Sequence, residues 1–456
     1  MKYVALVFSF FYIVSSTQAQ NKDSIFISNL AYNIMNKSEA YSNLAFLCKK
    51  IGHRLTGSAG MYKAEDWGLK TMQAYAPNLC LKQPCKIKCW KRGAKENFEI
   101  TTTKGKQKIN ITALGNSIGG VVKNAEILML NDVADLPANA KNIKGKIIFF
   151  NKAFKNEDIR TFISYSKTGS IRRSGPTDAA RYGAVGVITR SLTHSVDNNP
   201  HTGTTQYNDS LPKIPCAAIG YYDANMLAQI LPTQTVKGNL TTSGYFHKDT
   251  VGNNIIAELT GTDFPNKIIT IGGHLDSWDL AEGAHDDGAG IVQTMEILRA
   301  FNALGYKPKH TIHFVLFCNE ENGGAGGDAY AKNILAFNNR KNIPVLALES
   351  DAGGFSPRSF GVTANATILA NMQAFVPLLK PYGVYEITAG GGGSDIAPLM
   401  AAYKTPQVGL LPDSQRYFDV HHAASDVLEN VNKRELELGA LNMAAFIYLV
   451  DTYSTY

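Results

Sequence analysis

After its first twenty residues, the chain has no apolar run of the about 20 residues that a membrane-spanning helix needs. It also lacks clusters of lysine and arginine. The formal net charge is only +7 over 456 residues and the basic residues are scattered, so no nucleic-acid surface is predicted. No internal repeat is present. Apolar residues make up 45% and charged residues 18% of the chain, which is typical of a globular protein and excludes overall disorder.

The first nineteen residues have the layout of a cleavable secretory signal. Lys2 supplies a positive charge, Tyr3 to Val14 form an apolar run, and Ser15 to Ala19 form a small, polar tail. The apolar run is too short for a membrane anchor. The sequence therefore predicts a signal peptide at 1–19 and a mature protein that is secreted, periplasmic or located in another lumenal compartment.

Cysteine is scarce as well, with six residues in the whole chain. None precedes Cys48, which excludes a lipid-modified cysteine at the amino-terminal end. An oxidising compartment permits a disulfide within the cluster of Cys80, Cys85 and Cys89, although spacing does not reveal the pairing. A zinc knuckle at this cluster is disfavoured, because it has no CxxC pair and no histidine nearby.

Three segments with different residue patterns follow one another along the chain. This is consistent with the two or three domains that its length suggests at about 150 residues each. Residues 23–78 show helical spacing of apolar residues, broken by a turn at 56–60 before a second helix at 61–75. Short strands, one helix and a long polar loop at 191–210 fill the middle third, which has no cluster of acids or imidazoles.

From residue 254 onward, strands and helices alternate. Strands are predicted at 267–271, 311–317 and 345–348, and helices at 288–304, 326–335 and 434–453. This alternation predicts an α/β fold, with a mixed central sheet covered by helices on both faces, plus a smaller β-rich inserted domain. The predicted domains are a discontinuous catalytic domain at 20–108 and 250–456 and an insert at 109–249.

Acidic and imidazole side chains directly follow the three predicted strands: His274 and Asp276, then Glu320 and Glu321, then Asp351. In open α/β sheets, sites form beyond the carboxyl ends of the strands, so these groups are expected at one edge. Asp286 and Asp287 precede a helix, and His422 lies in a loop before the final helix.

Each group alone has a structural alternative. Asp286 or Asp287 can be a helix N-cap, the Glu320-Glu321 pair can be a solvated turn, and a single histidine such as His422 is more often structural. Together, however, four or more carboxylates would repel one another and raise their own pKa values unless a cation were present. Imidazole and carboxylate ligands suit zinc, and a two-metal site needs a bridging carboxylate.

Five segments in the same order resemble the metal motifs of M28 peptidases, closest to the carboxypeptidase Q branch: 274–279, 283–290, 320–324, 349–353 and 421–426. The resemblance covers nearly the whole mature chain, including Arg54 to Ser58. The insert is similar to a protease-associated domain through residues 144–148 and 179–186. The family implies the zinc exopeptidase fold, which is phosphorylase/hydrolase-like.

Carried over residue by residue, the resemblance implies two zinc ions bridged by Asp286. One ion would be completed by His274 and Asp351, and the other by Glu321 and His422. Glu320 would be the general base, and Asp276 would orient His274.

Two further histidines, His421 and His285, lie next to these positions in the sequence. His422 is preferred to His421, because the family ligand stands four residues before the aspartate that matches Asp426. His285 departs from the apolar residue of relatives, and a structural or supporting role is expected for it.

The predicted function is a secreted di-zinc exopeptidase that hydrolyses dipeptides or N-terminal peptide bonds. The glycine run at 390–393 suits a loop that approaches a ligand closely, so Ser394 or Asp395 is expected to bind a substrate terminus, and Tyr417 to steady the oxyanion. The partners are peptide substrates, with no nucleic acid and no membrane span, and the family suggests a homodimer. Two alternatives remain: a glutaminyl cyclase-like acyltransferase with one zinc, and a non-catalytic binding protein.

Overall fold

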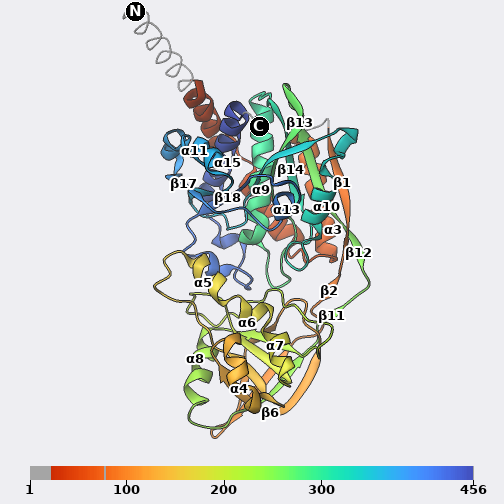
Figure 1. Ribbon diagram of the computed structural model, residues 1–456, viewed down its shortest axis with the longest axis vertical. Helices are drawn as coiled ribbons and strands as arrows, with labels where there is room; N and C mark the ends of the chain where they lie inside the picture. The colour runs from red at the N-terminus through yellow and green to blue at the C-terminus, as the bar shows by residue number, and fades with distance from the viewer. Residues whose placement is uncertain (1–21, 76–78, 455–456) are drawn as a thin grey trace, which may run out of the picture.

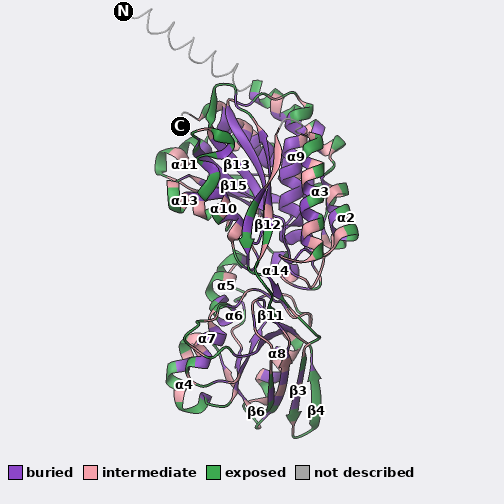
Figure 2. Cartoon of the chain, turned by 90° about the vertical axis from the view of Figure 1, so that its right-hand side faces the viewer, coloured by how far each residue is buried: buried purple, intermediate pink, exposed green. Residues whose placement is uncertain are grey.

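The computed structural model describes residues 22–75 and 79–454, which form two units stacked along the long axis of the molecule (Figures 1 and 2). The predicted signal peptide at 1–19 lies outside these residues. Among the helices that the structure describes, none is long and apolar enough to cross a membrane.

The first unit is built on an eight-stranded mixed sheet. Its strands, in spatial order, are β1 (Cys80–Ile87), β12 (Thr250–Leu259), β14 (His310–Phe317), β13 (Phe264–His274), β15 (Ile343–Glu349), β18 (Gln407–Pro412), β16 (Pro357–Thr363) and β17 (Glu386–Ala389). The centre is parallel, from β14 through β13 and β15 to β18, whereas β1, β12 and β16 pair antiparallel with their inner neighbours. The predicted mixed central sheet is confirmed.

Both faces of this sheet are buried, because successive residues of each strand point to opposite sides. In β13, Ile269 and Ile271 join one hydrophobic cluster and Ile268 joins another. The same alternation divides Leu346 from Ala347 in β15. A strand buried on both faces has a continuous apolar sequence, which is why these strands are visible in the sequence.

Helices cover the two faces separately (Figure 2). One face packs against the helix at 22–37 and against α2 (Ala40–Phe46), α3 (Ala59–Tyr75), α9 (Ala289–Ala303) and α15 (Lys433–Tyr453). The other packs against α10 (Ala325–Ile334) and α13 (Ala397–Tyr403), and α11 (Ala366–Gln373), α12 (Val376–Leu379) and α14 (Tyr417–Val420) complete the unit. Helices on both faces were predicted. The sequence predicts no element between residues 349 and 433, where strands β16, β17 and β18 lie.

The second unit has its own eight-stranded sheet. Its spatial order is β4 (Gly105–Ile109), β3 (Asn97–Thr102), β10 (Lys237–Thr242), β6 (Gly120–Leu130), β7 (Ile147–Phe150), β8 (Gly186–Arg190), β9 (Cys216–Ile219) and β5 (Ile111–Ala113). The helices of this unit are α4 (Leu136–Ile143), α5 (Thr161–Thr168), α6 (Ser170–Arg173), α7 (Gly175–Arg181) and α8 (Tyr221–Ile230). Two hydrophobic clusters lie on its two sheet faces. Its likeness to a protease-associated domain stays a prediction.

The chain enters and leaves the second unit through a short ribbon, in which β2 (Trp90–Lys91) pairs with β11 (Tyr245–Phe246) (Figure 1). Strand β4 pairs with β3, and β3 pairs with β10, so both strands belong to the second sheet. The sequence places the start of the insert at residue 109, after these two strands. We therefore propose that the insert runs from about residue 92 to 249 and that the ribbon of β2 and β11 connects it to the first unit.

All six cysteines are free thiols. The three clustered ones point to different places: Cys80 Sγ lies 3.9 Å from the carbonyl oxygen of Leu69, Cys85 Sγ 3.5 Å from that of Gly252, and Cys89 Sγ 3.8 Å from that of Gly57. The disulfide that their spacing allows is absent.

Candidate metal centre

Three neighbouring parallel strands deliver the first group of candidate side chains to one edge of the sheet. His274 is the last residue of β13, Glu320 and Glu321 follow β14, and Asp351 follows β15. Because parallel strands end at the same edge, residues nearly eighty positions apart in the chain meet there. The sequence-based expectation of one shared edge matches this geometry.

Two loops bring the remaining pair. Asp286 lies in the tight turn Ala284–Gly288 before α9, and His422 follows α14 with a left-handed backbone, φ 62°. The buried carboxylate of Asp426 ties these loops together, accepting hydrogen bonds from the backbone N–H groups of His285 (2.7 Å) and Asp286 (3.1 Å). The spacing from His422 to Asp426 thus has a structural reason.

Asp286 lies at the centre of the group and presents one carboxylate oxygen to each side. Its Oδ1 is 3.2 Å from Nε2 of His274, which is itself 3.5 Å from Oδ1 of Asp351. Its Oδ2 is 3.2 Å from Nε2 of His422, which is 3.0 Å from Oε2 of Glu321. Two sets of donor atoms therefore converge, and they share one carboxylate.

Four buried atoms of these side chains have no hydrogen-bond partner among residues 22–75 and 79–454: Nε2 of His274, Oδ2 of Asp286, Oε1 of Glu321 and Oδ1 of Asp351. The other ring nitrogen, Nδ1, explains how the rings of His274 and His422 are oriented. Nδ1 of His274 lies 3.0 Å from the backbone carbonyl of Asp276, and Nδ1 of His422 lies 3.3 Å from that of Thr202. A carbonyl only accepts, so Nδ1 of His274 carries a proton and its Nε2 faces the shared space. Nδ1 of His422 lies between the Thr202 carbonyl and Nη1 of Arg172, at 3.4 Å, and its Nε2 faces the same space. This is the donor set of a metal site.

The protonation of these groups shows how much negative charge is concentrated here. Burial acts to lower the pKa of His422, but the Glu321 and Asp286 carboxylates together outweigh it and raise the pKa to about 10. Burial and the Asp286 carboxylate raise the pKa of Glu321 to about 8. Burial also acts to raise the pKa of Asp286, yet the His274 and His422 imidazoles hold it well below its ordinary value. Protons supply the compensating positive charge, a role that a divalent cation can take over.

The carboxylate of Asp276 accepts from the backbone N–H groups of Glu320 (3.0 Å) and Glu321 (3.3 Å) and from the hydroxyl of Thr56 (2.9 Å). Nδ1 of His274 lies 3.0 Å from the backbone carbonyl of Asp276 and 3.9 Å from its Oδ1. Asp276 therefore contacts the His274 ring mainly through its main chain, and its carboxylate fixes the turn that carries the two glutamates.

Asp287, next to the central carboxylate, has the structural role that the sequence left open for either aspartate. Its carboxylate accepts from the backbone N–H of Gly290 at 2.9 Å, which caps α9, and from that of His274 at 3.0 Å. Asp287 thus accepts from an N–H of the first turn although Gly288 holds the N-cap position, whereas Asp286 faces the converging atoms.

Two further histidines lie close by. His285 is turned away: its Nδ1 accepts from the N–H of Gly354 at 3.1 Å, its Nε2 donates to the carbonyl of Asn430 at 3.1 Å, and its ring stacks on Phe355. It is a structural histidine. His421 stacks on His422, and its Nε2 is 3.7 Å from Oδ2 of Asp286, farther than the nitrogen of His422.

The three residues predicted to bind substrate have different surroundings. Ser394 and Tyr417 line a cleft beside Glu320, whereas Asp395 is 1% exposed and does not line it. The backbone N–H of Asp395 donates to Glu349 instead. A direct contact of the Asp395 carboxylate with substrate is therefore not supported.

The glycine run before these residues serves packing. Gly391 has φ +144° and lies so close to the backbone of Gly361 that a Cβ would meet it at 2.5 Å, and a Cβ on Gly393 would meet the Glu349 carboxyl at 2.0 Å. The glycine run was expected to approach a ligand closely; in the structure it approaches Gly361 and Glu349 of the same chain instead.

Arg54 and Thr56, which belong to the amino-terminal motif, support the same edge. The buried guanidinium of Arg54 donates to the carbonyl oxygens of Leu275 (2.7 Å), Glu282 (2.6 Å) and Gly283 (3.0 Å), so it holds the loops on both sides of the centre. Its pKa is lowered by burial.

The insert contributes contacts that the sequence does not predict. The backbone N–H of Thr202 donates to the carbonyl of His422 at 2.9 Å, Thr204 Oγ1 donates to the carbonyl of Glu321, and Asn116 Nδ2 donates to that of Asn322 at 3.1 Å. These contacts are made to backbone atoms and come from two separate segments of the insert, one at Asn116 and one at Thr202 to Thr204. No residue type or spacing marks them in advance.

A cleft of about 480 Å³ opens between the two units over the candidate centre. Its first wall carries the acids and histidines of the first unit. The insert contributes the facing wall, which consists of Asn116, Phe162, Tyr165, Arg172, Arg173, Thr204 and Gln206. A ligand in the cleft would therefore touch both units.

Comparison with known proteins agrees with this arrangement. Residues 254–447 match the model of Peptidase family M28. Carboxypeptidase Q of Homo sapiens is 32% identical over 428 residues, covering 93% of this chain and 88% of the relative. The crystal structure of a peptidase M28 precursor from Shewanella amazonensis SB2B superposes with a TM-score of 0.88 at 30% identity, covering 96% of this chain and 98% of the other.

A more distant structure shares the fold alone. BSAP, a zinc aminopeptidase from Bacillus subtilis, has a TM-score of 0.63 at 19% identity, with 90% of this chain and 94% of the other covered. The identity and coverage of the human relative, together with the family match over the sheet that carries the candidate centre, show that this chain belongs to peptidase family M28.

Proposed function

We propose that the protein is a di-zinc exopeptidase that hydrolyses dipeptides or N-terminal peptide bonds. The observation that carries the proposal is the position of Asp286, whose two oxygens face His274 and Asp351 on one side and Glu321 and His422 on the other. One shared carboxylate between two donor sets is what a pair of metal ions about 3.5–4 Å apart requires.

The donor atoms fit zinc. Imidazole nitrogen and carboxylate oxygen are ordinary zinc ligands, and the converging buried atoms lack other partners. His274, Asp286 and Asp351 form one group whose donor atoms lie within 4.8 Å of one another. We assign His422 rather than His421 to the second ion, because its Nε2 also lies 3.0 Å from Glu321. The Bacillus subtilis aminopeptidase of the same fold is a zinc enzyme.

Glu320 is proposed as the general base. Bound zinc would polarise the scissile carbonyl and lower the pKa of the attacking water. The Glu320 carboxyl lines the cleft beside the converging donor atoms, where it could reach a water bound to the metals. Glu320 would take the proton of the water and pass it to the departing amine. The Asp276 carboxylate would hold Glu320 in position by accepting a hydrogen bond from the backbone N–H of Glu320.

Tyr417 and Ser394 are the remaining candidates for substrate contact. Both line the cleft beside Glu320. Tyr417 is 2% exposed and its ring stacks on Phe162 of the insert, which fixes its position. We propose that its hydroxyl steadies the oxygen that becomes negatively charged during attack, and that Ser394 contacts a substrate terminus.

The test uses free dipeptides and aminoacyl amides, with and without chelator and with added zinc. Hydrolysis should stop on chelation and return with zinc, and each chain should hold two zinc ions. Full activity with one zinc ion would instead favour a cyclase-like acyltransferase, and a chain that holds no metal and cleaves nothing would favour a binding protein. The intact donor sets argue against both.

Substitution of Glu320 separates chemistry from metal binding. Glu320→Gln should lower kcat by at least about a thousandfold, because the amide cannot accept the proton, while zinc content stays unchanged. The matched control is Glu429→Gln, since Glu429 is exposed and pairs only with Lys49 among the described residues. Wild-type activity in Glu320→Gln would refute the assignment.

Export and assembly are further parts of the proposal. The signal-like residues 1–19 support secretion or transfer to the periplasm, which amino-terminal sequencing of the mature protein would test by showing a start after Ala19. The family resemblance supports a homodimer, which light scattering on the purified protein would test.

A further inference from the structure

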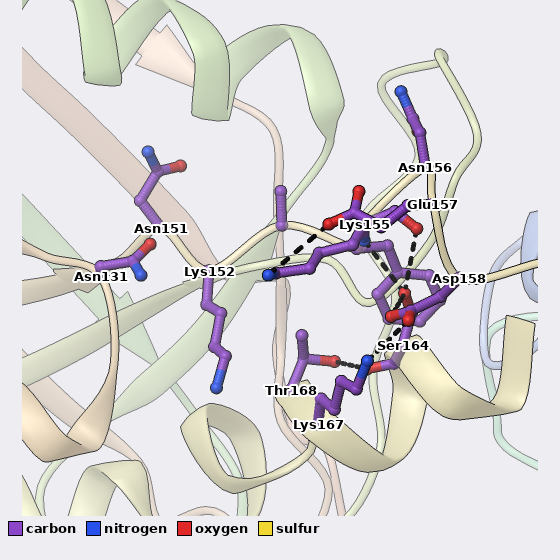
Figure 3. A pocket seen from close by; sticks show the side chains of 12 residues that line it. Asn131, Asn151, Lys152, Lys155, Asn156, Glu157, Asp158, Ser164, Lys167 and Thr168 are labelled. Atoms are coloured by element: carbon purple, nitrogen blue, oxygen red, sulfur yellow. Dashed lines mark hydrogen bonds and ion pairs between the residues drawn. The ribbon is translucent and has the colours of Figure 1, made fainter.

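The insert has a second cavity, which shares no described lining residue with the cleft over the candidate metal centre (Figure 3). It is lined by residues 151–158, by Asn131 and by one side of α5, and we call it the insert cavity. Its volume of about 730 Å³ is within the range of pockets that hold small molecules. A separate ligand site in the insert is therefore sterically possible.

The insert cavity lies at the carboxyl ends of two adjacent parallel strands. Asn131 follows β6 and Asn151 follows β7, and the two strands pair with Leu130 opposite Phe150. Ligands of open α/β sheets bind in crevices beyond this end of the strands. The insert cavity thus has the same place in the second sheet that the candidate metal centre has in the first.

The amide of Asn151 is held in a fixed orientation at this strand end. The buried guanidinium of Arg190, the last residue of β8, donates from Nε to Oδ1 of Asn151 at 2.8 Å and from Nη2 to Oδ1 of Asn225 at 2.6 Å. Because its oxygen accepts from Arg190, the Asn151 amide offers its NH2 group as a donor. Such a donor suits a carboxylate or carbonyl oxygen of a ligand.

The insert cavity carries charges of both signs, and they balance. Each of its three lysines has an acidic partner: Lys155 lies 3.6 Å from Glu157, Lys167 lies 2.6 Å from Asp158, and Lys152 pairs with Asp132. A simple anion would be attracted by the lysines and repelled by the carboxylates, and a simple cation would meet the reverse. A ligand with one charge of each sign is complementary to both.

The pair of Lys155 and Glu157 is the one that a ligand can engage (Figure 3). Its charged atoms are 3.6 Å apart, longer than a hydrogen bond, and the two side chains are 63% and 72% exposed. An exposed ion pair contributes little to stability, so both side chains can turn to a ligand at small cost. Asp158, by contrast, is also held by the hydroxyl of Ser164 at 2.8 Å.

Helix α5 separates the insert cavity from the cleft. Ser164, Lys167 and Thr168 line the insert cavity, whereas Phe162 and Tyr165 line the cleft. Residues three and four apart share one side of a helix, so the two groups lie on different sides of α5. A ligand in the insert cavity would therefore touch the helix that forms part of the cleft.

The same segment packs on α14 of the first unit. Phe154 of the insert cavity contacts Phe418 with ring centroids 5.4 Å apart, and Phe162 stacks on Tyr417 at 5.4 Å. Tyr417 is the residue proposed to steady the oxyanion. A ligand that fixes the segment around α5 would therefore also fix Tyr417.

We propose that the insert cavity binds a small zwitterion, either a free amino acid or a short peptide. Lys155 and the Asn151 amide bind its carboxylate, and Glu157 binds its ammonium group. The bound ligand holds α5 against α14 and raises kcat at the candidate metal centre. Only this last step rests on the proposed function, because the binding site is defined by the insert alone.

Calorimetry on the zinc-saturated protein tests the ligand class with three probes. These are alanine, alaninamide, which lacks the carboxylate, and N-acetylalanine, which lacks the ammonium group. Alanine should bind about tenfold or more tightly than either, as expected when a hydrogen bond between charged groups is lost. Equal affinity for the three probes would overturn the assignment of a zwitterion.

Two variants locate the binding. Ala153→Phe fills the insert cavity from an exposed position, and Lys155→Gln removes the partner of the carboxylate. Each should weaken alanine binding about tenfold or more. The matched controls are Ala153→Ser, which adds little volume, and Lys123→Gln, an exposed lysine of β6 outside the insert cavity. Alanine that binds only in the cleft, as a product, would leave all four variants like wild type and would overturn the proposal.

Alanyl-alanine distinguishes the two sources of a zwitterion. It is used with Glu320→Gln, in which it should not be hydrolysed, and the binding that counts is the part removed by adding Ala153→Phe. If that part is tighter for alanyl-alanine than for alanine, the ligand is a short peptide. If it is weaker or equal, the ligand is an amino acid, and both results support the insert cavity.

Steady-state kinetics with leucinamide tests the link to the metal centre. Saturating alanine should raise kcat about fivefold in wild type and leave it unchanged in Ala153→Phe. Alanine in the cleft competes with substrate and raises only KM, so the split between kcat and KM separates the two sites. Binding without a rise in kcat would overturn the coupling and keep the ligand site. If wild type shows no zinc-dependent hydrolysis, the proposed function fails, and calorimetry alone decides on the insert cavity.

Discussion

The backbone N–H of Thr202 donates a hydrogen bond of 2.9 Å to the carbonyl oxygen of His422, and the carbonyl of Thr202 lies 3.3 Å from Nδ1 of the same histidine. One residue of the insert thus holds both the backbone and the ring of a candidate metal ligand. Groups that contact the outer nitrogen of a ligating histidine commonly set its orientation and its affinity for metal.

Thr202→Pro should therefore weaken the second zinc site. Proline has no N–H to donate, so the His422 loop loses its anchor, and zinc affinity should fall about 10- to 100-fold. Thr202→Val is the control: it keeps the N–H and loses only the hydroxyl bond to Ala113. Competition with a chromogenic chelator measures the affinity, and thermal unfolding checks that both variants fold. Unchanged binding of the second zinc in Thr202→Pro would contradict a supporting role of the insert.

Much of the catalytic unit could be predicted because its information is local. Strands β13, β14 and β15 are buried on both faces, so they are continuous apolar runs, and the polar residues at their ends stand out. His274, Glu321 and Asp351 were expected at one edge for that reason, and the structure brings them together with Asp286 and His422.

The rest could not be predicted because it depends on backbone groups and on tertiary placement. Thr202 acts through its N–H and C=O, which every residue type except proline possesses. Arg173 is one of many exposed arginines until the fold turns it towards the cleft. Asp395 has the residue type of a ligand but is buried, and the Asp276 carboxylate accepts its hydrogen bonds from the glutamate turn and from Thr56, with Nδ1 of His274 farther away at 3.9 Å.

Asp276→Asn should lower kcat more than it lowers zinc affinity. An amide can replace only one of the two accepting oxygens, so the N–H of Glu320 or of Glu321 loses its partner and the turn shifts. A buried donor left without a partner costs about 1–3 kcal/mol, which corresponds to roughly a 5- to 150-fold loss in kcat if it is expressed at the general base. Thr56→Val, which removes only the hydroxyl bond to Asp276, is the milder control. Steady-state kinetics at saturating zinc is the measurement, and a loss of zinc with intact kcat would point to His274 instead.

The glycine run should prove structural. Gly391→Ala forces a Cβ to within 2.5 Å of the Gly361 backbone at φ +144° and should cost about 3 kcal/mol or more in unfolding free energy. Gly390→Ala has φ +84° with nothing within 4 Å, so only the conformational cost of about 1–2 kcal/mol applies. Urea unfolding of both variants compares the two values. Equal destabilisation would mean that the contact with Gly361 is not tight in solution.

Stability should fall as the pH drops below neutral, in part because of His201. This side chain is 2% exposed, its Nδ1 donates to the carbonyl of His421 at 2.7 Å, and its Nε2 has no partner among the residues that the structure describes. Burial lowers its pKa to about 4, whereas an unfolded histidine titrates near 6.5. Between these values the unfolded chain binds a proton that the folded chain excludes. The unfolding free energy therefore decreases as the pH falls, by roughly 3 kcal/mol across the window.

The variant His201→Asn isolates this contribution. The asparagine amide can still donate to the carbonyl of His421 but does not titrate, so its unfolding free energy should decrease less than that of wild type between about pH 6.5 and pH 4. Urea unfolding at several pH values, with chelator present in every sample so that zinc release does not differ between them, gives the two slopes. Identical slopes would show that His201 is protonated in the folded protein and that the loop behind His422 is open to water.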